Sequence, residues 1–218
     1  GFYEGKTADD IVAEMKRGNG LISHEDLKAY KAVWRNAVSS TYKHYKIISM
    51  PPPSSGGIAL IQLLKSVERY PIAQWGHNTA RTVHLLTEVE RRAYADRAAF
   101  LGDPDFFEVP QAVLISDAYV NERMRSFDST RATPSRDVRE GNVNIHESPE
   151  TTHLSVVDTH GNAVAVTTTL NDWFGSAVVV AGSGFFLNDE MDDFSIKPGQ
   201  PNMYGVVGGE ANKIEPGK

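Results

Sequence analysis

A stretch of 22 residues, Ser129 to Glu150, divides this 218-residue chain into two parts of different character. It holds two prolines, a glycine and three arginines, and its apolar residues follow neither a helical nor a strand period. Connections of this length inside compact domains are uncommon and are usually functional or disordered. Helical patterns dominate before it and alternating patterns follow it. The sequence therefore predicts an α+β protein, helix-rich before residue 128 and β-rich after residue 151.

The first part contains helical periods bounded by capping and stop signals. Thr7 is the expected N-cap of a helix over Thr7–Arg17, and Ser23 and Asp26 have capping-box spacing in a second helix, Ser23–Lys31. The longest expected helix is Thr79–Phe100, with an apolar face through Val83, Leu86, Val89 and Ala93. The other expected elements are strands at Trp34–Ser39 and His44–Met50, a helix after Gly57 with Ile58, Ile61, Leu64 and Val67 on one face, and a helix at Ser116–Arg125.

A β-hairpin is expected directly after the long stretch. Thr152–Val157 and Ala163–Leu170 alternate in polarity around a turn at residues 158–162, and short strands at Val178–Val180 and Gly184–Leu187 follow. If Asp158 pairs with Asn162, paired residue numbers sum to 320 and Thr151 lies opposite Thr169. A shift of one residue places Thr168 there instead. Directly opposite Cβ atoms lie ~4.5–5.5 Å apart, so two hydroxyls meet at the open end of the hairpin. On the residues alone, an ordinary cross-strand Thr–Thr pair is the favoured explanation.

The charge is concentrated in the last third of the chain. The net charge is −6, from 22 basic and 28 acidic residues, and residues 151–218 carry −5 of it. This balance argues against a general nucleic-acid binder, which would show a basic stripe. Much of the acid lies in the run Asp189-Glu190-Met191-Asp192-Asp193. Such a run is typical of a solvated loop, and the alternative is a site for a cation or a substrate ammonium group.

The sequence gives little support for a disulfide, a metal site, a phosphate-binding loop or a membrane span. The chain has no cysteine, which excludes disulfides, thiolate metal sites and cysteine nucleophiles. His77 and His84 could share a helix face, but the sequence offers no third ligand, so we expect no metal site. The glycine pairs lack a phosphate-loop pattern, and no cofactor is implied. No run reaches the ~20 apolar residues of a membrane span.

Several motifs in the same order resemble one enzyme family, the γ-glutamyltransferases (γ-glutamyltranspeptidases). Thr151-Thr152-His153-Leu154-Ser155-Val156-Val157-Asp158 resembles the start of the family's small subunit. The likeness continues through Phe174-Gly175-Ser176 and Met191-Asp192-Asp193-Phe194-Ser195. Motifs similar to the large subunit lie upstream: Phe2-Tyr3-Glu4-Gly5, Met50-Pro51-Pro52-Pro53-Ser54-Ser55-Gly56-Gly57, Arg91-Arg92-Ala93-Tyr94-Ala95-Asp96-Arg97 and Leu101-Gly102-Asp103-Pro104.

The resemblance implies a fold and a division of the chain. The family belongs to the N-terminal-nucleophile hydrolases, so the expected fold is part of a four-layer αββα sandwich. Residues 1–150 would be the C-terminal part of the large subunit, with 129–150 as a flexible pre-cleavage segment. Residues 151–218 would begin the small catalytic subunit. Because family members are more than twice as long, the chain is expected to be a piece that is weak or inactive alone.

The resemblance also implies a reaction and its residues. The precursor would cut itself between Glu150 and Thr151, leaving Thr151 as the nucleophile and Thr169 as its hydroxyl partner. Asn171, Glu190 and Asp193 match the residues that contact the substrate α-ammonium group. His153, beside the nucleophile, is expected to be structural. The family's carboxylate-binding residues and oxyanion hole lie outside this chain.

The implied partners are γ-glutamyl compounds such as glutathione, acceptor amino acids or peptides, and the other subunit of the same precursor in a heterodimer. Neither nucleic acid nor a membrane span in this chain is expected, and the implied location is periplasmic or secreted. Two alternatives stay open: a related acylase acting on glutaryl or cephalosporin-type amides, and a non-catalytic fragment or pseudoenzyme.

Overall fold

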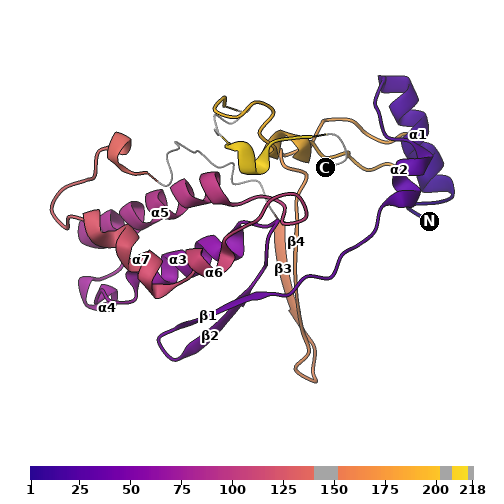
Figure 1. Cartoon of the computed structure of the whole chain (residues 1–218). Helices are drawn as coiled ribbons and strands as arrows, with labels where there is room; N and C mark the ends of the chain where they lie inside the picture. Colours follow the sequence, from indigo (N-terminus) through magenta and orange to yellow (C-terminus); the bar gives the residue numbers. More distant parts are fainter. Residues whose placement is uncertain (140–151, 202–207, 216–218) are drawn as a thin grey trace. The chain divides into compact units, whose positions relative to one another are not determined.

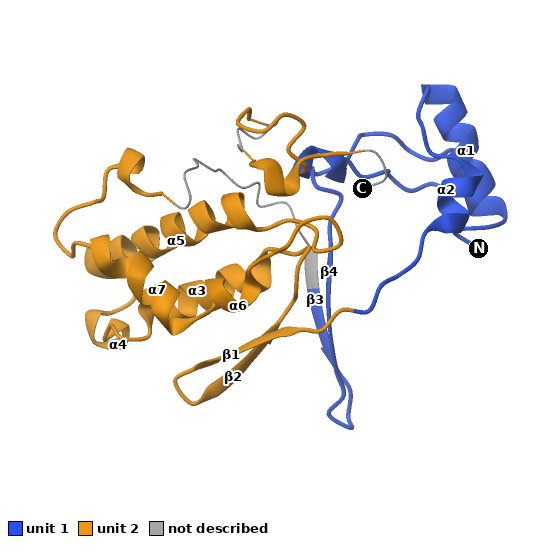
Figure 2. Ribbon diagram, viewed as in Figure 1, with its two compact units in different colours: residues 1–34, 148–193 blue, residues 35–147, 194–218 orange. Residues whose placement is uncertain are grey.

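A computed structural model of the chain describes residues 1–139, 152–201 and 208–215, without the side chains of Thr152 and His153. Figure 1 labels its elements. The chain divides into two units, each assembled from two separate stretches of sequence: Gly1–Trp34 with Ser148–Asp193, and Arg35–Glu147 with Phe194–Lys218 (Figure 2). Each unit therefore takes residues from both sides of the predicted cleavage point. Glu150 and Thr151 lie outside the described residues.

The larger unit, residues 35–147 and 194–218, is built around two packed helices, α3 (Gly56–Val67) and α5 (Ala80–Phe100). An antiparallel hairpin of β1 (Val38–Tyr42) and β2 (Tyr45–Ser49) packs against α3. The first strand begins four residues later than expected, and Trp34 is fully exposed. The unit is completed by α4 (Ile72–Trp75), α6 (Gln111–Leu114), α7 (Asp117–Arg123), and the 3₁₀ turns η1 (Met124–Ser126), η2 (Ser135–Asp137) and η4 (Glu210–Asn212).

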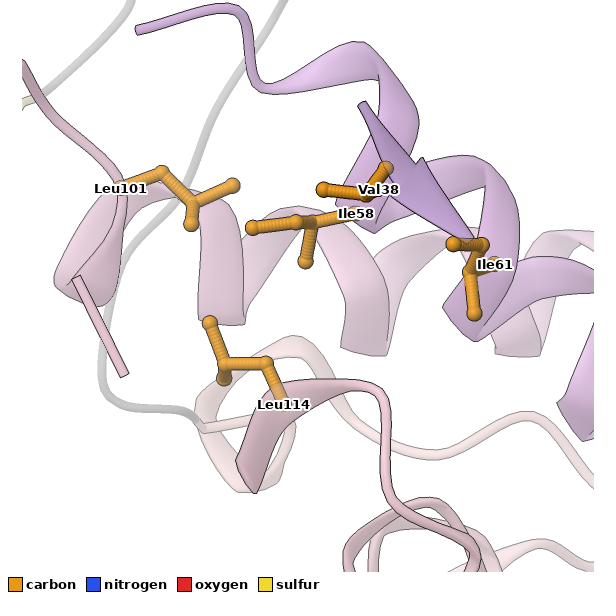
Figure 3. Close-up of a cluster of buried hydrophobic side chains, with 5 residues drawn as sticks. All are labelled: Val38, Ile58, Ile61, Leu101 and Leu114. Atoms are coloured by element: carbon orange, nitrogen blue, oxygen red, sulfur yellow. The ribbon is translucent and has the colours of Figure 1, made fainter. Parts of the chain in front are cut away.

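The expected apolar face of α3 forms a core of this unit. Ile58 and Ile61 are almost fully buried and pack with Val38, Leu101 and Leu114, whose side chains Figure 3 shows gathered around α3. Gly57 lets the helix approach the hairpin, because a Cβ atom there would lie 2.0 Å from the Met50 carbonyl oxygen. Any larger residue would push the helix away from the hairpin. The glycine therefore sets the helix–hairpin spacing in this core.

The buried face of α5 differs from the expected one. The helix begins one residue after Thr79, whose hydroxyl accepts a hydrogen bond from the Thr82 amide. Leu85, Val89 and Ala93 are buried, but Val83 and Leu86 are 49% and 39% exposed. The predicted apolar face is wrong because the buried side of α5 also contains the charged residues Glu88, Arg92 and Asp96. Apolar periodicity cannot identify a buried face whose charged groups neutralise one another inside the protein.

The smaller unit, residues 1–34 and 148–193, contains α1 (Lys6–Gly18), α2 (His24–Ala29), η3 (Glu190–Asp193) and a hairpin of β3 (Thr152–Val157) and β4 (Ala163–Thr168). The predicted capping box of α2 is confirmed, with Ser23 and Asp26 bonded reciprocally. Thr7 is not an N-cap, because α1 begins one residue before it, after Gly5. Gly5, the residue before the helix, has a φ of 99°, a conformation that favours glycine.

The expected strands after β4 are reduced to one bridge. Val179 pairs with Phe186 as an isolated antiparallel bridge, and hydrogen bonds of the surrounding turns replace a longer ladder. Among the described residues, each sheet has two strands, so the β character after residue 151 comes from β3, β4 and bridges. No described helix has the length and apolar character needed to cross a membrane.

The core around α3 makes a graded stability prediction. We expect Ile58→Val to lower the free energy of unfolding of the full-length protein by about 0.5–1.5 kcal/mol, and Ile58→Ala by about 2–5 kcal/mol. The second change removes more buried surface and leaves a larger cavity. Chemical denaturation followed by circular dichroism measures both values. Equal midpoints for the two variants and wild type would contradict the assigned core.

Candidate active site

The turn of the β3–β4 hairpin is closed by the Asp158 carboxylate. Its Oδ1 accepts hydrogen bonds from the His160 and Asn162 amides, both at 2.9 Å, and its Oδ2 accepts from Asn162 Nδ2 at 2.7 Å. These bonds, chiefly the one from the Asn162 side chain, lower the pKa of Asp158. The backbone amide of Asp158 also donates to the Asn162 carbonyl at 3.0 Å. The predicted Asp158–Asn162 pairing is confirmed.

The register follows from this turn. Val157 pairs with Ala163 and Thr152 pairs with Thr168, so the paired numbers sum to 320 throughout the ladder. The alternative register, which would have placed Thr168 opposite Thr151, is excluded for the described residues. Because side chains alternate between the faces of a strand, one step of register decides which threonine faces the site.

Thr169 begins a turn that links the end of β4 to the acidic run. Its Oγ1 accepts a hydrogen bond from the Asn171 amide at 2.9 Å. Asn171 is 8% exposed and has a φ of 73°, and its Nδ2 donates to the Asp189 carbonyl at 3.2 Å. Asparagine tolerates this left-handed conformation better than most residues. Thr169 and Asn171 are thereby held beside the segment that leads into η3.

The loop that supports η3 returns along itself and needs a glycine. The Ser176 amide donates to the Leu187 carbonyl at 3.0 Å, and the Leu187 amide donates to the Val178 carbonyl at 2.9 Å. Gly175 has a φ of 54°, and a Cβ atom there would lie 2.2 Å from the Leu187 carbonyl oxygen. Any other residue would force the two arms of the loop apart. This contact gives Gly175 a structural role.

The carboxyl group of Glu190 has a raised pKa. Its burial raises the pKa of its carboxyl group, and the charges of Asp193 and Asp189 raise it further, while a hydrogen bond with the Thr169 hydroxyl acts in the opposite direction. The Glu190 Oε1 atom is buried and has no hydrogen-bond partner among the described residues. A partly buried carboxylate beside like charges is costly, and the cost falls when it is protonated or when a cation joins it. The arrangement therefore favours a positively charged ligand.

Four of the predicted site residues thus come together in one unit: Thr169, Asn171, Glu190 and Asp193. Glu150 and Thr151 lie outside the described residues, as does the side chain of His153. Asp189 is a residue whose role the sequence reasoning missed, because it was treated only as part of an acidic run. Its amide donates to the Leu170 carbonyl at 3.1 Å, and its Oδ1 accepts from the Asp172 amide at 3.1 Å. An Asn-Asp pair before a 3₁₀ turn is the signal that could have identified it.

Histidines do not form a metal centre in the described part of the chain. There, no group of three or more His, Asp or Glu side chains is arranged to hold a metal ion. His84 instead has its Nε2 atom 2.8 Å from the Asp128 carbonyl oxygen and its ring against Phe127. This histidine therefore has a packing role at the end of the helical unit.

Comparison with known proteins shows the family of the chain. Residues 1–218 match the family model of gamma-glutamyltranspeptidase. The chain is 49% identical over 217 residues to the glutathione hydrolase proenzyme of Escherichia coli (strain K12), covering 100% of this chain and 37% of that protein. It therefore spans well under half the length of this relative.

Two solved structures extend the comparison to the fold. A γ-glutamyltranspeptidase of Helicobacter pylori superposes with a TM-score of 0.62 at 40% identity, covering 68% of this chain and 42% of that one. A cephalosporin acylase of Bacillus halodurans superposes with a TM-score of 0.77 at 25% identity, covering 100% of this chain and 36% of that one. The predicted fold class, that of the N-terminal-nucleophile hydrolases, is confirmed. Within this class, the chain belongs to the γ-glutamyltranspeptidase family.

The acidic cluster makes a prediction that does not depend on catalysis. In the full-length protein, we expect the pKa of Glu190 to lie above its ordinary value of 4.5. Asp193→Asn should lower it more than Asp189→Asn, because Asp193 exerts the stronger of the two charge effects. Carboxyl ¹³C chemical shifts followed against pH measure the three values. A pKa that neither substitution changes would mean that Glu190 is solvated and independent of its neighbours.

Proposed function

We propose that this chain is part of a self-processing γ-glutamyltransferase and hydrolase in which Thr151 is the nucleophile. The observation that carries the proposal is the register of the β3–β4 hairpin. The described ladder ends at the Thr152–Thr168 pair, and its register supports the prediction from the sequence that Thr151 would lie opposite Thr169. The name of the Escherichia coli relative, a glutathione hydrolase proenzyme, supports both a precursor and its substrate.

Maturation would begin at the bond between Glu150 and Thr151. The Thr151 hydroxyl attacks the Glu150 carbonyl carbon, the peptide C–N bond breaks in an N-to-O acyl shift, and water hydrolyses the resulting ester. Glu150 leaves as a carboxylate, and Thr151 gains a free α-amino group. A threonine hydroxyl needs a nearby base, and an α-amino group with a pKa near 7.7–8.0 can serve as one. An amide nitrogen cannot, so the cleavage creates the catalyst.

Turnover would use the same hydroxyl. The Thr151 oxygen attacks the γ-carbonyl carbon of a γ-glutamyl amide such as glutathione, while the α-amino group of Thr151 takes the hydroxyl proton. The C–N bond of the amide then breaks, and the amine leaves with that proton. The resulting γ-glutamyl ester is then transferred to water or to the amine of an amino acid or peptide. Thr169 would hold the nucleophile by a hydrogen bond. Its own oxygen already accepts from the Asn171 amide, which fixes its position.

Asn171, Glu190 and Asp193 would bind the α-ammonium group of the substrate. The support is electrostatic: Glu190 is partly buried beside two other carboxylates, and a cation would offset the cost of holding these charges together. This explanation accounts for the acidic run better than a solvated loop does. The oxyanion hole and the groups that bind the substrate carboxylate would come from the rest of the protein.

Cleavage at Glu150 would leave two subunits that remain associated, residues 1–150 with the large subunit and 151–218 with the small one. Contacts across this boundary within each unit support a heterodimer. In the smaller unit, the Ser183 hydroxyl donates to Asp10 Oδ2 at 2.6 Å, and the Phe2 and Phe185 rings lie 5.9 Å apart. In the larger unit, η4 packs against α5 with Ala211 buried. The periplasmic or secreted location stays a prediction of the family resemblance.

A cephalosporin-type acylase is the second candidate, and the superposition with such an enzyme favours it for the fold. The acidic cluster argues against it for the substrate. A glutaryl group has no α-ammonium group to neutralise Asp193 and Glu190. A fragment that only binds or assembles is the third possibility, and it offers no reason for a desolvated carboxylate beside Thr169.

The nucleophile assignment has a direct test. In the full-length protein, Thr151→Ala should abolish both self-cleavage and turnover, because it removes the only hydroxyl proposed to attack. Thr151→Ser should retain part of both, since it keeps the hydroxyl and the future α-amino group. Thr152→Ala is the matched control and should still cleave. Intact-mass spectrometry during incubation detects the new N-terminus, and cleavage before residue 151 in the alanine variant would refute the assignment.

The role of Asp193 can be separated from a purely structural one by two substrates. Charge-assisted hydrogen bonds contribute roughly 1.5–3 kcal/mol, so Asp193→Asn should lower kcat/KM for a γ-glutamyl anilide by at least ~10-fold. It should spare a glutaryl anilide, which lacks the α-ammonium group. Asp192→Asn is the control for the removal of any negative charge from η3, and it should leave kcat/KM for the γ-glutamyl anilide nearly unchanged. A parallel loss on both substrates would make Asp193 a structural turn residue.

A further inference from the structure

A loop over residues 176–188 of the smaller unit ends directly before the acidic run. Its two arms meet at the isolated bridge between Val179 and Phe186. At its tip, which runs from Val180 to Phe185, the Val180 amide donates to the Phe185 carbonyl at 2.9 Å. The side chain of Val180 is fully buried, so the tip is part of the folded unit. The loop therefore connects a buried tip to the acidic run through two paired arms.

The base of the loop fixes the backbone of the acidic run. Asn188 Oδ1 accepts a hydrogen bond from the Glu190 amide at 3.0 Å. Between them, the Asp189 amide donates to the Leu170 carbonyl at 3.1 Å, and the Asp189 carbonyl accepts from the Asn171 side chain at 3.2 Å. Glu190 follows directly along the chain. The position of its carboxyl group therefore depends on the arm that returns from the tip.

The loop has few internal interactions to keep it closed. The described part of its ladder forms one isolated bridge, and Gly182 and Gly184 at its tip both have positive φ values. Glycine loses more conformational freedom on folding than any other residue, and a pair of strands alone is marginally stable in water. A contact that holds the tip from outside the loop therefore contributes to the order of both arms.

Asp10 of α1 makes such a contact. Its Oδ2 accepts hydrogen bonds from the Ser183 hydroxyl and from Lys6 Nζ, both at 2.6 Å. A Cβ atom at Gly182 would lie 3.1 Å from each oxygen of this carboxylate, so the carboxylate lies against the backbone of the tip. The bonds from Lys6 and Ser183 lower the pKa of Asp10, which is therefore ionised at neutral pH. Hydrogen bonds to an ionised acceptor are shorter and stronger than bonds between neutral groups.

We propose that Asp10 is a positioning residue for the binding of the substrate α-ammonium group, acting through Ser183 and the loop over residues 176–188. The proposal rests on the proposed function, in which residues of the acidic run bind that group. After the proposed cleavage, Asp10 would belong to the large subunit and Ser183, 173 residues later, to the small one. The ammonium site of the small subunit would thus depend on a carboxylate from the large subunit.

The test uses Asp10→Ala and Ser183→Ala in the full-length protein after self-cleavage. Each should raise KM for a γ-glutamyl anilide about three- to tenfold, the usual range for coupling through a packed network, and leave kcat unchanged. The affinity for a glutaryl anilide, measured as a substrate or as an inhibitor, should not change, because that compound has no α-ammonium group. The double variant should be no worse than Asp10→Ala alone, since both substitutions remove the same bond.

Asp9→Ala is the matched control. Asp9 precedes Asp10 on the same helix, its side chain is 67% exposed, and its carboxylate lies 3.6 Å from His24 Nε2. Within the described residues it has no hydrogen bond or ion pair to the loop, so its KM should equal that of wild type. Ser183→Ala removes one oxygen atom and carries the test alone if Asp10→Ala does not fold.

Hydrogen exchange measures the loop itself. Asp10→Ala should speed exchange several-fold at the amides of Val180 and Leu187, which are bonded within the loop, and leave the Asn162 amide of the β3–β4 turn unchanged. Wild-type KM in both single variants, an equal loss of affinity for both anilides, or additive effects in the double variant would overturn the positioning role and leave Thr151 as the proposed nucleophile. If wild type does not hydrolyse the γ-glutamyl anilide, the proposed function fails, and the positioning role fails with it.

Discussion

The carboxylate of Asp158 is the interaction on which the arrangement of the candidate site depends. By accepting hydrogen bonds from the His160 and Asn162 amides and from the Asn162 side chain, it fixes the conformation of the turn. The turn sets the register of β3 and β4, and the register sets which threonine reaches the open end of the hairpin. A two-stranded hairpin has little stability of its own in water, so a strongly specified turn matters more here than in a broad sheet. The turn thus determines the pairing of Thr152 with Thr168 at the far end of the ladder, which it does not contact.

The acidic cluster at η3 shows the opposite use of carboxylates. Asp158 is exposed and hydrogen-bonded, and its pKa is lowered, whereas Glu190 is partly buried beside like charges and its pKa is raised. The hydrogen bonds of Asp158 stabilise the turn, while the negative charges around Glu190 repel one another. Under the proposed function, the α-ammonium group of the substrate would neutralise this charge. The two carboxylates thus differ in their surroundings, and the partial burial of Glu190 makes the difference.

Buried charge also organises the larger unit. In α5, the buried Glu88 and Arg92 are bonded to each other and to Ser126 of η1 and Thr133 of the following segment. The buried Asp96 is paired with Arg123 of α7. Replacing such a network by apolar groups is often neutral for stability, so its value lies in which segments it holds. Here it holds Thr133 against α5, 45 residues earlier in the chain.

Local signals in the sequence were sufficient for five of the helices and for the hairpin turn, but not for α4 and α6, nor for the choice between two hairpin registers. The Ser23 cap, the Asp158–Asn162 turn and the apolar face of α3 all act over a few residues, and the structure retains them. Motifs in order also indicated the family, and with it Thr169, Asn171, Glu190 and Asp193. The tertiary structure alone decided what depends on distant partners. In the folded chain, Val83 is exposed and Glu88 is buried. Asp189 accepts hydrogen bonds from Asn171 and Asp172, and Thr133 bonds to Glu88, 45 residues earlier. Periodicity reports which residues are apolar, but whether a charge is buried depends on partners that only the folded chain brings to it.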